Sequence, residues 1–149
     1  MPSPFPHRHA TRIARTSSSR ARIEAPPRDT IAGGPPVEHD GDAMAWSAEQ
    51  LLLASLGMYL LAAFDALAAS QQVEVFGWEA SASATVDRTA SGLAFTGFTL
   101  DVSIATSDPE RARATLATAT RHCLVANALR VPVDVNATFS IAAGKAALT

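Results

Sequence analysis

Residues 47–67 read SAEQLLLASLGMYLLAAFDAL, and this stretch decides the fold. Ser47 followed three residues later by Gln50 is a capping-box pattern, in which each side chain satisfies a backbone donor that the first turn leaves unpaired. Glu49 adds a negative charge to that turn, where the helix dipole favours it. The apolar side chains that follow point all round the axis, so the sequence predicts a long helix that is buried on every side.

The same stretch must be tested as a membrane span. Its uncharged run, residues 50–64, is fifteen residues long, whereas a span needs about 20. We therefore expect a buried core helix and no association with a membrane. Residues 1–9 contain no apolar run of signal-peptide length, and we expect them to form a flexible tail.

Downstream of this helix the pattern changes to the two-residue period of strands. Within residues 93–104, apolar side chains at 98, 100, 102 and 104 alternate with polar ones, and residues 73–86 precede this segment across a turn at 89–92. This pattern predicts a β-hairpin. Residues 131–141 alternate in the same way and predict a last strand.

A second helix is predicted to begin at residues 107–110, with a proline in its first turn, where proline is tolerated. The apolar side chains of this helix recur every three or four residues, which indicates a single buried stripe. They are Ala112, Leu116, Ala119 and Cys123.

The N-terminal part of the chain predicts a further hairpin. Residues 10–25 alternate weakly about a serine-rich turn, and Pro26 and Pro27 close the pattern. The predicted order is therefore hairpin, long helix, hairpin, helix and strand. That order is typical of an α+β fold, and we expect one domain over residues 10–149.

Composition narrows the possible partners and the cellular compartment. A net charge of −2 gives no electrostatic reason to expect nucleic acid as a partner. The chain has one cysteine, so it has no internal disulfide, and a reducing cytoplasm is the natural setting.

Two segments of the chain resemble the signature segments of the OsmC/Ohr family of thiol-dependent organic hydroperoxide reductases. The first is the helical stretch from Ser47 to Leu60, and the second is His122-Cys123-Leu124-Val125-Ala126-Asn127. The resemblance extends from about residue 10 to residue 141 and implies the family's α+β fold. The reactive cysteine of the family falls at Tyr59, so the chain resembles a divergent member that lacks the nucleophile.

The resemblance also implies roles for other residues. Glu49 matches the glutamate of the family's site, although Ala48 replaces the usual proline before it. Cys123 matches the resolving cysteine, although Leu124 replaces the proline that normally follows. The family's arginine should lie in the first hairpin, where Arg12, Arg15 and Arg20 are candidates and Arg15 is preferred.

Tyrosine cannot replace the lost thiol. Its phenol has a pKa near 10, and its oxygen cannot cycle through a sulfenic acid as a thiolate does. The two-cysteine cycle is therefore unavailable within this chain. Met58, the neighbour of Tyr59, is not a cysteine either, so a one-residue shift of the match leaves this conclusion unchanged.

Helix geometry adds a prediction about assembly. Glu49 and Tyr59 are ten residues apart, which is roughly 15 Å along one straight helix. If both border one pocket, Glu49 must come from a second copy of the helix. A helix that is apolar on all sides also needs more cover than one sheet gives. We therefore predict a two-fold homodimer with pockets at its interface.

Three functions follow from these observations. The first is a pocket protein that binds a small apolar or hydroperoxide-shaped ligand without turning it over, with Tyr59, Met58 and Leu56 lining the pocket. The second is a one-cysteine peroxidase or thiol-transfer enzyme that uses Cys123 and an external thiol in oxidative-stress defence. The third is a structural or regulatory partner protein.

Each candidate residue also has a purely structural interpretation. Cys123 fits an inert buried thiol, Tyr59 a space-filling aromatic, and Glu49 a first-turn acid that only supports its helix. The histidines at positions 7, 9 and 39 match no zinc-ligand spacing. We therefore expect no metal and no cofactor.

Overall fold

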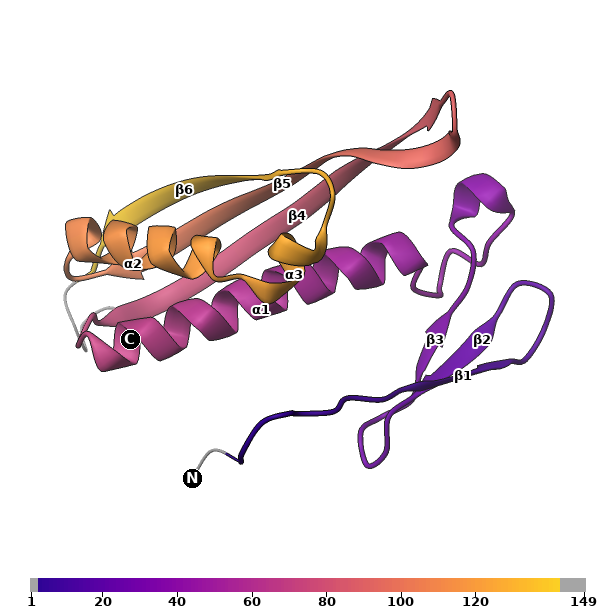
Figure 1. The fold of residues 1–149 in the computed structure, drawn as a ribbon, viewed down its shortest axis with the longest axis horizontal. Coiled ribbons are helices and arrows are strands. Elements are labelled where there is room, and N and C mark those ends of the chain that lie inside the picture. Colours follow the sequence, from indigo (N-terminus) through magenta and orange to yellow (C-terminus); the bar gives the residue numbers. More distant parts are fainter. Residues whose placement is uncertain (1–2, 143–149) are drawn as a thin grey trace. The chain divides into compact units, whose positions relative to one another are not determined.

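The computed structural model describes residues 3–142 and has the predicted α+β architecture (Figure 1). The chain forms two compact units, one up to Leu51 and one from Leu52 onward. The single domain predicted for residues 10–149 remains a prediction. In chain order the elements are β1 (Arg12–Arg15), β2 (Ala21–Glu24), β3 (Ile31–Gly33), the 3₁₀ turn η1 (Val37–His39), α1 (Ala48–Ser70), β4 (Val75–Thr89), β5 (Gly92–Thr106), α2 (Pro109–Arg121), α3 (Leu124–Ala128) and β6 (Val133–Ile141).

The first unit is built on a three-stranded antiparallel sheet in the order β1-β2-β3. The predicted N-terminal hairpin is confirmed, with Ile13 opposite Ile23. The third strand was not predicted, because its three residues lie among glycines and prolines that indicate a loop. It pairs Ile31 with Ile23 on the free edge of the hairpin.

The helix α1 begins as the sequence predicts. The backbone N–H of Gln50 donates to Ser47 Oγ at 3.1 Å, and the backbone N–H of Ser47 donates to Gln50 Oε1 at 3.0 Å. These two reciprocal hydrogen bonds form the capping box and fix the first turn of the helix. Such a cap contributes about 0.5–2 kcal/mol.

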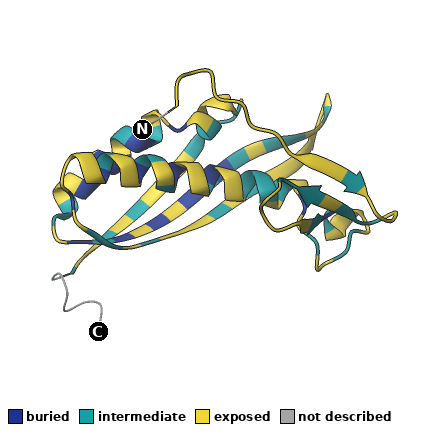
Figure 2. Ribbon diagram, turned by 90° about the horizontal axis from the view of Figure 1, so that it is seen from below, coloured by how far each residue is buried: buried dark blue, intermediate teal, exposed yellow. Residues whose placement is uncertain are grey.

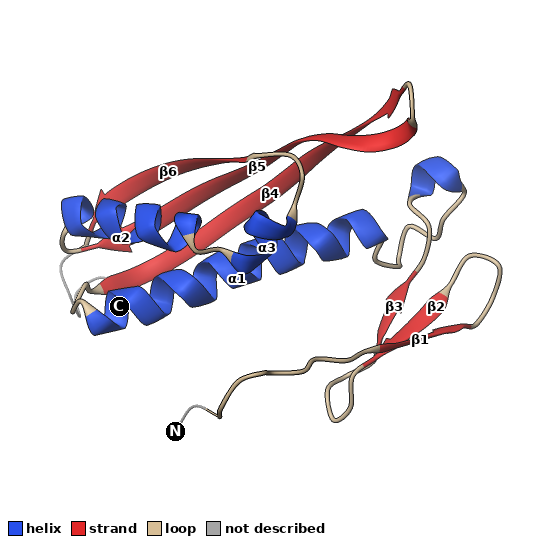
Figure 3. Cartoon of the chain, in the orientation of Figure 1, coloured by secondary structure: helices blue, strands red, loops and turns tan. Residues whose placement is uncertain are grey.

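The second unit is built on the sheet β4-β5-β6, drawn in red in Figure 3. Strand β5 is antiparallel to β4 and parallel to β6. The connection from β5 to β6 contains α2 and α3. Gly92 closes the β4–β5 turn with a φ of 116°, a backbone conformation that glycine adopts most readily. The predicted hairpin and last strand are thus confirmed.

The two faces of this sheet differ in polarity. The residues of β5 that face the core are buried, and their partners on β6 are apolar, as in the pairs Phe98–Val133 and Leu100–Val135. The intervening positions, such as Asp101 opposite Asn136, are polar and exposed. One face is therefore covered by helices, and the other is polar in the single chain.

Helix α1 buries one stripe of its surface against this sheet. The stripe recurs every four residues: Leu56, Leu60, Phe64 and Ala68. These residues share one core with the inner face of β5 and with the buried stripe of α2. Figure 2 shows buried and exposed bands alternating along α1 and the strands. Outside this stripe the surface of α1 is exposed in the single chain, where Met58 is 63% exposed and Tyr59, closer to the stripe, 38% exposed.

By length and composition alone, α1 is also long and apolar enough to cross a membrane. A core helix passes the same test, so this property is weak evidence for a span. We interpret α1 as a core helix because its stripe from Leu56 to Ala68 packs with α2 and the sheet.

Candidate functional site

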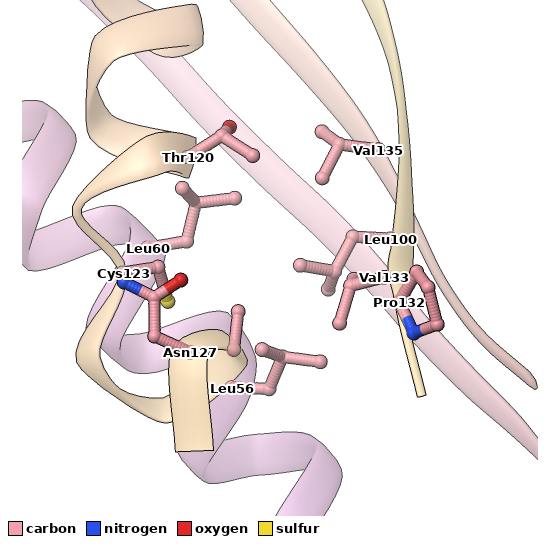
Figure 4. Close-up of a pocket in the computed structure, with 10 residues that line it drawn as sticks. Leu56, Leu60, Leu100, Thr120, Cys123, Asn127, Pro132, Val133 and Val135 are labelled. Atoms are coloured by element: carbon pink, nitrogen blue, oxygen red, sulfur yellow. The ribbon is translucent and has the colours of Figure 1, made fainter. Parts of the chain in front are cut away.

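The site is a cavity in the second unit, between the helices and the sheet. Its volume is about 190 Å³. Ten residues from α1, β5, the α2–α3 region and the start of β6 line it (Figure 4). They are Leu56, Leu60, Leu100, Thr120, Cys123, Ala126, Asn127, Pro132, Val133 and Val135.

Cys123 lies between two helices, not on the second helix where the sequence analysis placed it. Helix α2 ends at Arg121, and Cys123 is the extended residue that precedes α3, with φ −69° and ψ 108°. Its N–H donates to Thr120 O at 3.3 Å, and its carbonyl accepts from the N–H of Asn127 at 2.9 Å. The backbone is thus held on both sides of the thiol.

The thiol of Cys123 is a free, buried group on the wall of the cavity. The residue is 1% exposed and forms no disulfide. Figure 4 shows Cys123 among the residues that line the cavity with it, including Leu56, Leu60 and Asn127. The buried stripe predicted for Ala112, Leu116, Ala119 and Cys123 is confirmed, since all four are buried.

The other polar side chains of the cavity are partly engaged. Thr120 Oγ1 donates to Leu116 O at 2.8 Å, so its hydroxyl proton is used within α2. Asn127 Nδ2 donates to Arg121 O at 3.1 Å. Because a carbonyl can only accept, this bond fixes the amide orientation and leaves Asn127 Oδ1 as an acceptor. In Figure 4 that oxygen points toward the cavity.

No charged side chain occurs among the ten lining residues. The cavity therefore offers an apolar surface, one thiol, the acceptor oxygen of Thr120, and the oxygen and second N–H proton of the Asn127 amide, which is exposed to solvent at the edge of the cavity. It has no cation to stabilise a thiolate or a bound anion. These groups suit a neutral, mostly apolar molecule.

The structure brings two of the predicted site residues together. Leu56 and Cys123 both line the cavity. Tyr59 and Met58 lie on the exposed side of α1 and are not among the lining residues. Sequence reasoning gave Asn127 no role, although this residue lies in the second signature segment, residues 122–127.

Arg15 and Glu49 belong to the first unit. Arg15 Nε donates to Ser17 O at 3.0 Å. The other two candidate arginines each pair with an acid: Arg12 with Glu24 at 3.2 Å, and Arg20 with Asp42. Among residues 3–142, Arg15 is thus the candidate whose guanidinium forms no ion pair. Glu49 is half-buried in the first turn of α1.

The acids that pair with the other arginines are held in their charged form. Hydrogen bonds from Arg22 and Arg12 lower the pKa of Glu24. A backbone hydrogen bond from Met44 and a side-chain bond from Arg20 lower the pKa of Asp42. These pairs fasten the first sheet, which leaves their arginines less available for a ligand.

Comparison with known proteins shows which family the sequence matches and which solved structures share the fold. The profile of the family described as OsmC-like protein matches residues 39–138. An OsmC-like protein of unknown function from Vibrio cholerae superposes with a TM-score of 0.79 at 14% identity, over 89% of this chain and 100% of that one. No curated protein sequence matches the chain.

Two further solved structures carry functional names. An organic hydroperoxide resistance protein OsmC from Legionella pneumophila has a TM-score of 0.71 and 22% identity, over 91% of this chain and 99% of that one. The organic hydroperoxide resistance protein OhrB of Bacillus subtilis has a TM-score of 0.65 and 22% identity, over 89% and 98%. At these identities the likeness establishes the fold alone.

Proposed function

Because the chain belongs to the OsmC-like protein family, we propose that it is a member that binds a small apolar ligand and has lost the two-cysteine peroxidase cycle. One observation carries this proposal. The chain of 149 residues contains a single cysteine, Cys123. A cycle in which one thiol attacks a peroxide and a second thiol resolves the sulfenic acid needs two cysteines.

The cavity supports binding without turnover. Cys123 occupies the position that resembles the family's resolving cysteine, and Tyr59 occupies the position of the nucleophile. The side chains that surround Cys123 are apolar or neutral. Such a lining favours burial of an apolar molecule, whereas an activated thiolate is usually found beside a cation or a base.

Purified protein is therefore expected to consume organic hydroperoxide no faster than its Cys123→Ala variant when a dithiol such as dihydrolipoamide is the reductant. The reason is that neither protein can form the internal disulfide that the dithiol reduces. The measurement is the steady-state loss of tert-butyl hydroperoxide, with a two-cysteine family member as the reagent control. Turnover well above that of Cys123→Ala would contradict the proposed loss of activity.

The free thiol on the wall of the cavity favours one alternative, a one-cysteine peroxidase. The thiolate of Cys123 would attack and break the O–O bond, keep one oxygen as a sulfenic acid and release the other as an alcohol after it takes a proton. An external thiol would then expel water and form a mixed disulfide. A second thiol would regenerate Cys123 and release the disulfide of the two external thiols. Turnover that depends on Cys123 and a monothiol would support this alternative.

A homodimer in the cytoplasm is the second part of the proposal. The exposed side of α1 carries Met58 and Tyr59 among alanines, and the sheet of the first unit exposes Ile13, which is 63% exposed. A second copy that covers these apolar surfaces would remove them from water. It would also supply Glu49 from a second α1, which the spacing of Glu49 and Tyr59 requires if both residues border one pocket.

The protein is expected to sediment as a dimer at micromolar concentration, and an Ala62→Arg variant as a monomer. Ala62 is exposed and lies one turn after Tyr59 on the same side of α1, so an arginine there would place an unpaired charge in the interface. Sedimentation equilibrium gives the mass directly. The control is Ser83→Arg on the polar side of β4, which should remain dimeric. A monomeric mass for the unaltered protein would refute the dimer.

A further inference from the structure

We infer that Asn127 determines which head group the cavity accepts, so that the ligand is a small neutral molecule with one hydroxyl group and not a carboxylate. This inference rests on the proposed ligand-binding function and specifies the chemical class of the ligand. It is carried by the orientation of the Asn127 amide, the state of the Thr120 hydroxyl and the absence of charge among the ten lining residues.

The volume of the cavity limits the size of the ligand. An enclosed apolar cavity of about 150 Å³ accepts a molecule of the size of benzene. The cavity described above has a volume of about 190 Å³ and opens to solvent where Asn127 and Pro132 are exposed. It therefore suits a benzene ring with one small substituent, and a long fatty chain would have to extend beyond it.

The donors and acceptors of the cavity limit the head group. Thr120 gives its proton to Leu116 O, and Asn127 gives an amide proton to Arg121 O. Asn127 Oδ1 is then left as an acceptor that faces the cavity (Figure 4). A hydroxyl group on the ligand can donate to this oxygen, whereas a hydrocarbon cannot.

A carboxylate is disfavoured for two reasons. Its oxygens only accept hydrogen bonds, so they gain nothing from the Asn127 oxygen, and the donors left to them, the second Nδ2 proton of Asn127 and the thiol of Cys123, are neutral. No lysine, arginine or histidine occurs among the lining residues to offset the cost of transferring the charge out of water. The cavity thus favours a hydroxyl group through the Asn127 oxygen and disfavours a carboxylate because no positive charge lines it.

Three probes of nearly equal size test this inference: benzyl alcohol, toluene and benzoate at pH 7. We expect benzyl alcohol to bind about three- to tenfold more tightly than toluene, which is the usual net effect of one hydrogen bond. The affinity for benzoate should be at least about tenfold lower than the affinity for toluene. Dissociation constants come from chemical-shift titration of ¹⁵N-labelled full-length protein.

The substitution Asn127→Leu removes the acceptor and keeps the number and branching of the side-chain heavy atoms. In this variant the affinity for benzyl alcohol should fall to the affinity for toluene. The affinity for toluene should stay within about twofold of its value in the unaltered protein, because toluene forms no hydrogen bond that the substitution could remove. The matched control is Asn136→Leu, the same chemical change on the polar side of β6, outside the cavity lining. The control should keep the preference for the alcohol.

The outcomes separate this inference from the function on which it rests. If benzyl alcohol and toluene bind unaltered protein equally well, or if benzoate binds best, the role of Asn127 is refuted while ligand binding stands. If none of the three probes binds, the proposed pocket function itself fails. If Asn127→Leu does not fold, the ranking of the three probes on unaltered protein still decides the inference.

Discussion

Replacing Phe64 with alanine is expected to lower the free energy of unfolding by about 3–5 kcal/mol, the usual cost of removing a buried aromatic side chain. Phe64 is 0% exposed and stands first by volume among the fully buried side chains of the described residues. It lies at the centre of the stripe by which α1 joins the sheet and α2. Because the surrounding side chains cannot close the space completely, a cavity remains and adds to the lost burial. Urea unfolding followed by circular dichroism measures the change.

The matched control for Phe64 is Leu93→Ala in the β4–β5 turn region. Leu93 is 57% exposed, so its truncation should cost less than about 1 kcal/mol. A loss at Phe64 as small as that at Leu93 would contradict the packing of α1 on the sheet. This comparison also tests whether α1 is a core helix, because a helix that crossed a membrane would not gain its stability from this contact.

The sequence predicted those elements whose determining interactions lie between residues that are close in the chain. The Ser47–Gln50 capping box is present because both partners of each hydrogen bond lie within one turn. The alternation over residues 98–104 became the inner face of β5 because a strand exposes successive side chains to opposite faces. In both cases the pattern in the sequence and the physical cause lie within a few residues of each other.

Elements that depend on tertiary contacts were not predicted. Strand β3 consists of three residues, and it is defined by pairing with β2 and not by its own composition. The break of the second helix at His122 was also missed, because the stripe continues in register to Cys123. A helical period does not reveal that the chain becomes extended at the last residue of the stripe and restarts as α3.

The cavity could be predicted only in part. The stripe of α2 and the resemblance both indicated Cys123, and Leu56 followed from its place on α1. Asn127 was not predicted, because its role depends on a hydrogen bond to the carbonyl of Arg121 across the α2–α3 junction. The direction in which an amide oxygen points is a property of the folded backbone, and no spacing in the sequence encodes it.

The position of Tyr59 leads to the second large prediction: Tyr59→Cys should form an intrachain disulfide with Cys123 and gain hydroperoxide reductase activity with a dithiol. Tyr59 lies on α1 between Leu56 and Leu60, both of which line the cavity with Cys123. A disulfide needs Cα atoms about 4.4–6.8 Å apart, and the proposed match of Tyr59 to the family's reactive cysteine requires that residues 59 and 123 meet this condition. We expect turnover at least about tenfold above that of unaltered protein, since two thiols permit the cycle that one thiol cannot complete.

Met58→Cys is the matched control, because it adds the same thiol to the neighbouring residue. Successive residues on a helix point about 100° apart, and Met58 is 63% exposed whereas Tyr59 is 38% exposed. A cysteine at position 58 should therefore form no disulfide with Cys123 after mild oxidation, as peptide mass spectrometry would show. If Met58→Cys forms the bridge and Tyr59→Cys does not, the family's reactive position is Met58. If neither variant forms it, the scaffold has moved α1 away from Cys123, and the loss of the peroxidase cycle involves more than one substitution.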